Sequence, residues 1–171
     1  MFTMTKEEKD LYYMERAITL AKEAAEMDEV PVGAVLVSGD RIVGEGKNLR
    51  ETKKCATRHA ELCAIEEACA TLGGWRLPDS TLYVTLEPCP MCAGAIINAR
   101  VERVVYGAAD PKGGAMGSVI DLASLPFNHK PAVEAGVEQE KCKDILTNYF
   151  KTKRDKPNWK KTHKAKTSET E

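Results

Sequence analysis

The chain has 171 residues, of which 43% are apolar and 30% are charged, and its formal net charge is -1. This length suits one α/β domain with its own core and is short for two, and the near-neutral charge argues against a protein coated with nucleic acid. The sequence has no apolar run long enough to cross a bilayer and no secretory or organellar leader, so we expect a cytoplasmic protein without membrane contact.

The first third of the chain predicts a helix followed by two strands. Over residues 6–27, apolar residues recur at helical spacing and are expected on one buried side: Leu11, Met14, Ile18, Ala21 and Ala25. Pro31 ends this pattern. The runs VPVGAVLVSGD (30–40) and RIVGEGKN (41–48) are rich in β-branched residues and meet at a Ser-Gly-Asp turn. This arrangement is typical of an antiparallel hairpin.

The middle of the chain alternates between helix and strand patterns. A second helix is predicted from about His59 to a Gly-Gly stop, with a buried stripe formed by Leu62, Ile65, Cys69 and Leu72. The segment TLYVTLE (81–87) predicts a strand, residues 88–100 a short helix, and residues 101–108 another apolar strand. Strand, helix and strand at this spacing imply a parallel crossover, so we expect a single α/β domain.

The last third begins with the Gly-rich loop DPKGGAMGS at 110–118, and loops of this kind often carry function. A short strand is predicted at 132–137, and a final helix from about Gln139 to Lys153. We expect a folded domain over 1–154 and a basic tail over 155–171. Residues 151–166, which include most of this tail, have eight lysines or arginines against one acid, which fits either a solvated, disordered terminus or an arm that contacts phosphates.

The six cysteines, at positions 55, 63, 69, 89, 92 and 142, are expected to be core residues or metal ligands in a reducing compartment. Only Cys89 and Cys92 have ligand spacing, and with His59 they offer one imidazole and two thiolates. Such a set leaves the fourth tetrahedral position of Zn²⁺ open, as in a catalytic zinc site. These three residues are therefore the predicted zinc ligands. Cys63, one turn after the histidine, is also close, although a core role is favoured for it and for Cys69.

Glu61 lies two residues after the histidine and is the candidate proton shuttle. Zinc lowers the pKa of its bound water to about 7, so hydroxide is available at neutral pH. Attack on an aromatic amidine carbon also needs protons for the ring nitrogen and the departing ammonia, and acid–base help of this kind is worth roughly 10²–10⁴-fold. A C-x-x-C pair alone is a weak indication of metal. Combined with His-x-Glu and a preceding proline, it indicates a zinc-dependent nucleobase deaminase.

With these residues, the chain resembles the bacterial tRNA adenosine deaminases of the zinc cytidine deaminase superfamily, which convert the wobble adenosine of a tRNA anticodon to inosine. The resemblance runs from about Leu11 to Arg154 and includes EVPVGAVLV, the 110–118 loop and an FNH segment. It implies a three-layer α/β/α cytidine-deaminase-like fold, in which helices flank a central mixed five-stranded sheet. It also implies one zinc per subunit, a homodimer, and the anticodon arm of tRNA as partner.

The resemblance further implies contacts with the substrate. It places Asn48 and the Ala60 backbone at the adenine, Asn128 on the RNA beside it, and Asp110 at a ribose 2′-hydroxyl, the group that separates RNA from DNA. Tyr149 and Phe150 resemble the family's aromatic pair, of which one is expected to pack in the core. Three basic residues of the same helix suit phosphates, if they are more than a solvated face: Lys151, Lys153 and Arg154.

Some features leave alternatives open. Arg58 stands where many bacterial relatives have a small residue, which puts the substrate range in question. The competing enzyme is a deaminase of a free nucleobase or nucleoside, of the guanine or cytosine type. A third possibility is a zinc-stabilised RNA-binding subunit that has lost its chemistry, but such a site has no need of Glu61. His129 has no second ligand nearby and is expected to be a hydrogen-bonding loop residue.

Overall fold

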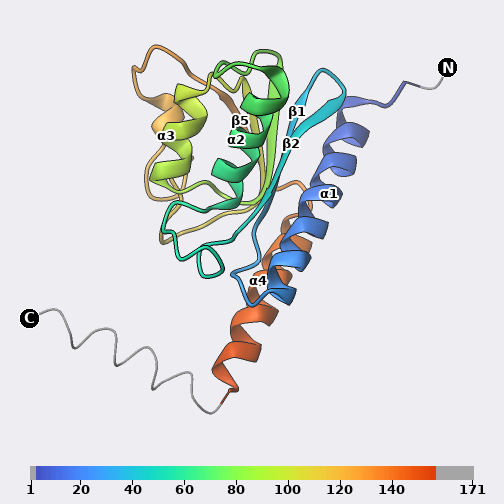
Figure 1. Cartoon of the computed structure of the whole chain (residues 1–171), viewed down its shortest axis with the longest axis vertical. Coiled ribbons are helices and arrows are strands. Elements are labelled where there is room, and N and C mark those ends of the chain that lie inside the picture. Colours follow the sequence, from blue (N-terminus) through green and yellow to red (C-terminus); the bar gives the residue numbers. More distant parts are fainter. Residues whose placement is uncertain (1–2, 157–171) are drawn as a thin grey trace, which may run out of the picture.

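The computed structural model describes residues 3–156, and helices and strands follow one another as the sequence patterns indicate (Figure 1). The strands are β1 (Gly33–Ser38), β2 (Arg41–Lys47), β3 (Ser80–Leu86), β4 (Arg103–Ala108) and β5 (Ala132–Ala135). The helices are α1 (Lys6–Glu26), α2 (Ala60–Leu72), α3 (Pro90–Asn98) and α4 (Gln139–Arg154), with a short 3₁₀ helix η1 (Leu122–Ser124). The basic tail predicted over 155–171 lies outside the described residues, apart from its first two positions.

The strands form one mixed sheet in the order β2-β1-β3-β4-β5. β1 runs antiparallel to β2 and β3, whereas β3, β4 and β5 run parallel to one another. The predicted hairpin and the predicted parallel crossover are both confirmed. Because parallel strands finish at the same edge of a sheet, the carboxyl ends of β3 and β4 lie beside each other. In open α/β sheets this edge is where ligands bind.

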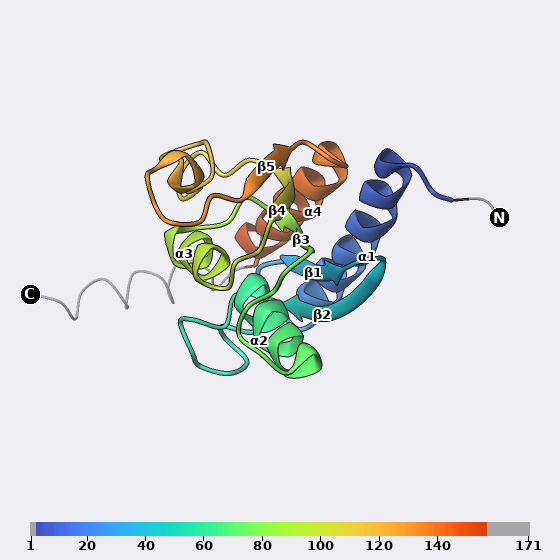
Figure 2. The ribbon, with the colours of Figure 1, turned by 90° about the horizontal axis from the view of Figure 1, so that it is seen from above.

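Helices cover both faces of the sheet and complete a three-layer α/β/α arrangement (Figure 2). α2 and α3 pack on one face, in a core that includes Leu36, Leu82 and Val104. α1 and α4 cover the other face, in a second core that includes Val35 and Val105. Neighbouring strand residues thus point into different cores, as the two-residue period of a strand requires. The expected cytidine-deaminase-like architecture, with its mixed five-stranded sheet, is confirmed.

The buried stripe of α2 differs from the predicted one. Ile65 is buried as predicted, but Leu62 and Cys69 are half-buried and Leu72 is 37% exposed. Small residues fill the interface instead, namely Ala60, Ala64 and Ala68, each fully buried. The reason lies in β2, where a Cβ added at Gly44 would lie 2.1 Å from the Ala64 carbonyl oxygen. Backbone therefore packs against backbone here, and only alanine and glycine fit.

The first helix also corrects one prediction. Met14, Ile18 and Ala21 are buried and Ala25 is half-buried, but Leu11 is 45% exposed. The inward position of that turn belongs to the preceding residue, Asp10, which is 5% exposed. A pattern based on apolar residues alone misses an inward carboxylate.

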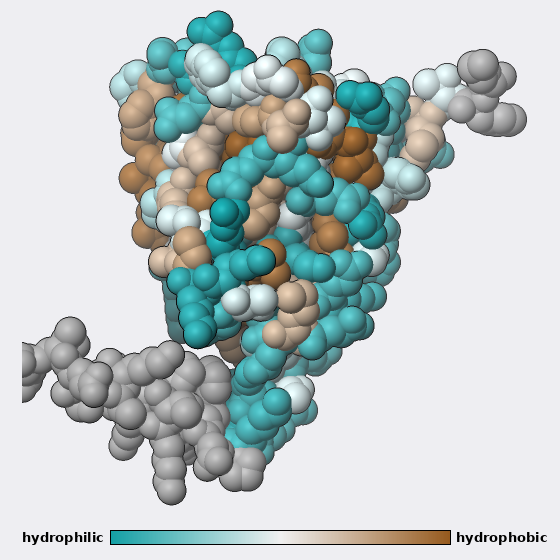
Figure 3. All heavy atoms as spheres, viewed as in Figure 1, coloured by the Kyte–Doolittle hydropathy of each residue, from teal (hydrophilic) through white to brown (hydrophobic). Residues whose placement is uncertain are grey.

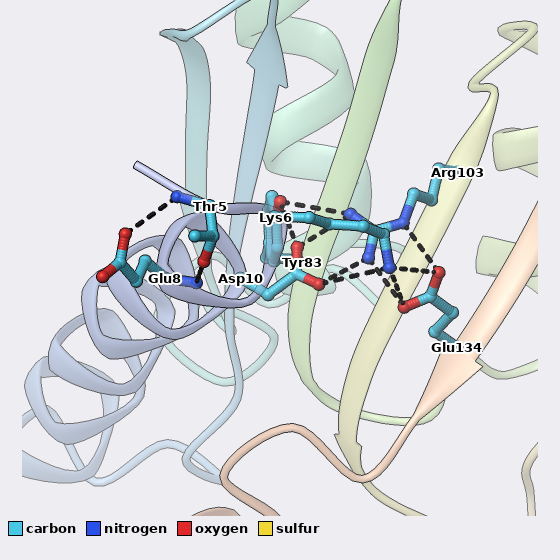
Figure 4. A network of polar contacts seen from close by, with 7 residues as sticks. All are labelled: Thr5, Lys6, Glu8, Asp10, Tyr83, Arg103 and Glu134. Carbon is cyan, nitrogen blue, oxygen red and sulfur yellow. Dashed lines mark hydrogen bonds and ion pairs between the residues drawn. The ribbon is translucent and has the colours of Figure 1, made fainter. Parts of the chain in front are cut away.

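Asp10 belongs to a polar network on the α1 side of the sheet, drawn in Figure 4. Its carboxylate accepts hydrogen bonds from the Tyr83 hydroxyl (2.8 Å) and from both terminal nitrogens of Arg103 (2.8 and 2.6 Å). The guanidinium also donates to Glu134 of β5, at 2.7 and 3.2 Å, and Lys6 donates to the same carboxylate. One arginine thus connects α1, β3, β4 and β5.

In Figure 3, hydrophilic residues cover much of the lower surface, near the ends of α1 and α4, while apolar residues are more frequent in the upper part. Some large apolar side chains are well exposed in the segment that follows the Gly-rich loop, namely Val119, Ile120 and Phe127. Within residues 3–156, no helix combines the length and the apolar character needed to cross a membrane.

Candidate active site

The three predicted metal ligands meet at the start of two helices. His59 is the residue that precedes the first turn of α2, and Cys89 has the same position before α3. Cys92 lies in the first turn of α3. The sulfurs of Cys89 and Cys92 each lie 3.6 Å from Nδ1 of His59, and the three ligand atoms lie within 4.8 Å of one another. Within the described part of the chain, this is the one such cluster of possible metal ligands.

The distances fit a tetrahedral zinc ion. Zinc–sulfur bonds of about 2.3 Å and zinc–nitrogen bonds of about 2.0–2.1 Å, at tetrahedral angles, separate sulfur and nitrogen by roughly 3.6 Å. This is the spacing found here between His59 Nδ1 and each sulfur. The side chains are therefore arranged as a three-ligand set, and the residues fit the metal that the sequence predicts.

The electrostatics of the centre also suit a cation. A hydrogen bond from the Cys92 thiol, together with one from His59, lowers the pKa of Cys89 to about 4. The same bond to Cys89 raises the pKa of Cys92, because that thiol is the donor. The pKa of His59 is raised through its hydrogen bond with Cys89. Both sulfurs lie at a helix N-terminus, where the helix dipole favours negative charge.

Glu61 lies beside this cluster, in the first turn of α2. Its side chain is 4% exposed, and burial raises the pKa of its carboxyl to about 7. A carboxyl with a pKa near neutrality can both take up and release a proton at physiological pH. This carboxyl lines the same cavity as His59 and Cys89.

A cavity of about 140 Å³ opens onto the cluster. Its apolar walls come from the segment before β1 and from the end of β3. Its polar groups come from the segment after β2, from both helix starts and from the Gly-rich loop. The lining residues are Val30, Val32, Asn48, Arg50, His59, Ala60, Glu61, Leu86, Glu87, Cys89 and Asp110. Most residues expected at the metal and the base thus share one small cavity, with Cys92 buried beside it.

Two polar side chains of the cavity are held by the backbone. The Asn48 amide donates to the Val30 carbonyl at 3.2 Å, and its oxygen accepts from the Arg50 N–H at 3.2 Å. Asp110 uses one oxygen, Oδ1, to accept from the N–H groups of Lys112 and Gly113, both at 3.1 Å. Each side chain is therefore oriented before any substrate enters.

Other predicted contacts lie outside the cavity. Asn128 is exposed and is not part of its lining, and Phe150 is 38% exposed on α4. Tyr149 is half-buried, and its hydroxyl donates to the Asp28 carbonyl at 3.0 Å. Lys153, which the resemblance suggests for phosphate, forms an ion pair with the Asp28 carboxylate at 2.5 Å. A phosphate at Lys153 would therefore compete with the Asp28 carboxylate.

Three other residues discussed from the sequence, His129, Cys63 and Arg58, lie outside the cavity lining. His129 Nε2 lies 2.6 Å from the Val101 carbonyl oxygen, so it is a hydrogen-bonding loop residue. Cys63 is half-buried and lies outside the ligand cluster. Arg58 turns away from the cavity, because its guanidinium pairs with Glu66 on the outer side of α2, at 2.5 Å.

Two buried glutamates near the cavity were missed by the sequence analysis. Glu29 is 1% exposed and accepts from the backbone N–H of Glu51 and from both the N–H and the hydroxyl of Thr52. Glu87 is 2% exposed and binds the Gly-rich loop. The position of Glu87, directly after a buried strand and before Pro-Cys, was the available signal. Arg50, a further lining residue, had no signal at all.

Comparisons with known proteins agree with this geometry. The family model for MafB19-like deaminases matches residues 8–154. The tRNA-specific adenosine deaminase of Bacillus subtilis (strain 168) is 51% identical over 149 residues, which cover 86% of this chain and 92% of that protein.

Solved structures give the same result. A structure described as a tRNA:A34 deaminase of A-to-I editing at the wobble position superposes with a TM-score of 0.77 and 46% identity, over 79% of this chain and 99% of that one. A guanine deaminase from Nitrosomonas europaea has a TM-score of 0.69 at 23% identity, over 87% and 86% of the two chains, and so shares the fold alone. The chain therefore belongs to the MafB19-like deaminase family and, within it, to the tRNA-specific adenosine deaminases.

Proposed function

We propose that this enzyme converts the wobble adenosine of a tRNA to inosine, with zinc held by His59, Cys89 and Cys92 and with Glu61 as proton shuttle. The observation that carries the proposal is the convergence of three ligand atoms and one buried carboxyl on a single small cavity. The choice of RNA over a free base is supported by the relatives, which are described as acting on tRNA and share about half of their residues with this chain.

His59, Cys89 and Cys92 would hold the zinc, which would lower the pKa of a water to about 7 and so supply the nucleophile at neutral pH. The start of α3 favours negative charge on both sulfurs, and a bound metal would keep both as thiolates. His59 and Cys89 come from different helices, so the relative placement of α2 and α3 sets the geometry of the centre. The cysteines and histidine thereby fix where the attacking oxygen can lie.

Glu61 performs the proton transfers. Water adds to C6 of the adenine and loses one proton to the carboxylate, which passes it to the ring nitrogen N1. The second proton of the water reaches the exocyclic amino group by the same route, and the C6–N bond then breaks to release ammonia. Inosine and ammonia together contain the atoms of adenosine and water. Because the carboxyl is buried in the cavity, bulk water does not compete for these protons.

The cavity walls bind and orient the base. Val30, Val32 and Leu86 offer apolar surface for the flat faces of a flipped adenine. The Asn48 amide and the free N–H groups at the start of α2, including that of Ala60, supply polar contacts for its edge. Asp110 lies at the loop side of the cavity, where its carboxylate can accept a hydrogen bond from a ribose 2′-hydroxyl.

The anticodon arm would extend from the cavity over exposed groups of the surface. Phe150 can stack on a base, and Lys151 and Arg154 suit phosphates, since all three are exposed. Asn128, also exposed, is proposed to contact the RNA from its loop. A homodimer would cover the apolar side chains of Val119, Ile120 and Phe127. Light scattering should give twice the mass of one chain, and a value for one chain would contradict the dimer.

The decisive experiment offers the zinc-loaded enzyme an anticodon stem-loop with adenosine at the wobble position, in parallel with free adenine, guanine and cytosine. Mass spectrometry of the digested RNA should show inosine at that position. Deamination of the free bases with no change in the RNA would contradict the proposal. A stem-loop with adenosine only at other positions serves as the control for site selection.

A further inference from the structure

The Gly-rich loop after β4 is organised by one side chain. Glu87 lies at the end of β3, and its Oε2 accepts from the N–H groups of Met116 (3.2 Å) and Ser118 (3.1 Å). Its Oε1 accepts from the Asp110 N–H at 3.3 Å and from the Ser118 hydroxyl. The two oxygens therefore bind the beginning and the end of the loop at once.

The loop is also shaped to fit around this carboxylate. A Cβ added at Gly114 would lie 1.9 Å from Glu87 Oε2, so the backbone approaches too closely for any other residue. The Gly114 N–H donates to the Asp110 carbonyl at 2.9 Å, which closes the turn on itself. The next N–H, of Ala115, donates to the Pro88 carbonyl at 2.8 Å. Loop and strand end are thus bonded on both sides of Glu87.

Within the described residues, the negative charge of Glu87 is balanced only by hydrogen bonds from the loop. Glu87 is 2% exposed, and no lysine or arginine of residues 3–156 forms an ion pair with it. A buried carboxylate is costly unless donors surround it, so the loop and the glutamate require each other. A change at Glu87 should therefore reach the whole loop.

One of the bound N–H groups belongs to Asp110, whose carboxylate lines the cavity. The side chain of Asp110 is in turn fixed through Oδ1 by the next residues of the loop. No hydrogen bond to its other oxygen, Oδ2, comes from residues 3–156. Glu87 thus sets the backbone from which Asp110 presents an acceptor to the cavity.

We propose that Glu87 is a positioning residue for substrate recognition: it folds the 110–118 loop so that Asp110 meets the ribose of the target nucleotide. The inference rests on the proposed function, because it takes a nucleotide within RNA as the substrate. It adds a residue that acts through the loop and determines how well RNA is distinguished from DNA.

The test is Glu87→Gln, which keeps the shape but replaces one acceptor oxygen with a donor amide that opposes the loop N–H groups. The KM for the anticodon stem-loop should rise roughly tenfold or more, since one hydrogen bond to a charged group is worth about 1.5–3 kcal/mol. The kcat at saturation should stay within about twofold, because the lost contact exists in ground and transition states alike. Replacing the target ribose by 2′-deoxyribose should then raise the KM of the variant only slightly, because the contact with the 2′-hydroxyl is already weakened.

Asp110→Ala should show the same pattern, and the double variant should be no worse than the poorer single variant, because both changes remove one contact. Asp10→Asn is the matched control. Asp10 is also a buried carboxylate with three donors, but it lies on the α1 side of the sheet. This control should lower stability and leave both KM and the ribose preference unchanged. If Glu87→Gln folds poorly, Ser118→Ala removes a single donor and should shift the ribose preference in the same direction.

Wild-type KM and ribose preference in both Glu87→Gln and Ser118→Ala would overturn the inference. Effects of Glu87→Gln and Asp110→Ala that multiply in the double variant would overturn it as well, since they would be independent. A wild-type enzyme that fails to deaminate the stem-loop would instead overturn the proposed function. The two failures are therefore distinguishable in one series of assays.

Discussion

Glu61 is the residue on which the chemistry depends most directly. Glu61→Gln keeps the volume of the side chain but removes its ability to carry a proton. We expect kcat to fall by roughly 10²–10⁴-fold, while bound zinc and the melting temperature change little. Glu66→Gln, on the exposed side of the same helix, is the control and should retain full activity. Unchanged turnover of Glu61→Gln would rule out the proposed shuttle.

Substitutions of the two cysteines near His59, Cys92 and Cys63, should affect the zinc content differently. Cys92→Ser removes a soft ligand, so the purified protein should contain well below one zinc per chain and show no deamination. Cys63→Ser, one turn along α2 from the histidine, should retain a full complement. Elemental analysis by mass spectrometry measures both. Full zinc in the Cys92 variant would mean that the ligand set is wrong.

At the scale of residues, the sequence predicted best the side chains whose role can be recognised from residue type and spacing alone. His59, Glu61 and Cys92 have spacings that few other functions require, and the structure brings them together. The position of Glu87 before Pro-Cys was a signal, but its role could not be predicted, because that role depends on a loop more than 20 residues away in the chain. The ion pair of Lys153 could not be predicted for the same reason, since its partner lies in the turn after α1.

Among the elements, the contact between β2 and α2 is the most exacting. Gly44→Ala would place a methyl group 2.1 Å from the Ala64 carbonyl oxygen, so helix and strand must separate. We expect a loss of roughly 1–3 kcal/mol in the free energy of unfolding, measured in urea. Gly74→Ala is the control, because no atom lies within 4 Å of its added Cβ. A Gly44 variant as stable as this control would contradict the close approach.

The network around Arg103 makes a prediction about acid stability. Arg103 and Lys6 lower the folded-state pKa of Glu134 to about 2, from an ordinary value of 4.5. A lowered folded-state pKa stabilises the fold above about pH 4.5, and this contribution is lost as the pH falls toward 2. Glu134→Gln should therefore be less stable than wild type at neutral pH, and the difference should shrink below pH 4.5. Urea titrations at several pH values would measure it, and a difference independent of pH would contradict it.

Order and type of the helices and strands were predictable because each has a clear period or a clear stop signal. The buried side of α2 was not, since hydrophobicity favours Leu62 and Leu72 whereas the close packing against β2 admits only small side chains. Leu11 shows a related limit. Inward polar residues such as Asp10 are invisible to a search for apolar stripes, because their partners come from other strands.

On the scale of the whole molecule, the proposed catalytic residues lie on one side of the sheet. The layer with α2 and α3 carries the ligands and the proton shuttle, while α1 and α4 cover the opposite face (Figure 2). The sheet order followed from the hairpin and crossover only in part: the placement of β5 beside β4 needed the structure. Residues that the sequence placed on RNA, such as Asn128 and Phe150, lie outside the cavity, so their role depends on how RNA lies across the surface.

The position of His59 beside Cys89 and Cys92 has a consequence for the stability and turnover of the protein. An ion held there ties together two segments some 30 residues apart, in the manner of a reversible cross-link. At a free zinc concentration 100 times its dissociation constant, such binding adds about 2.7 kcal/mol to stability. Chelation should therefore lower the melting temperature as well as stop turnover. When zinc is scarce, molecules without the ion would unfold and be degraded first, so the amount of enzyme would follow the metal supply.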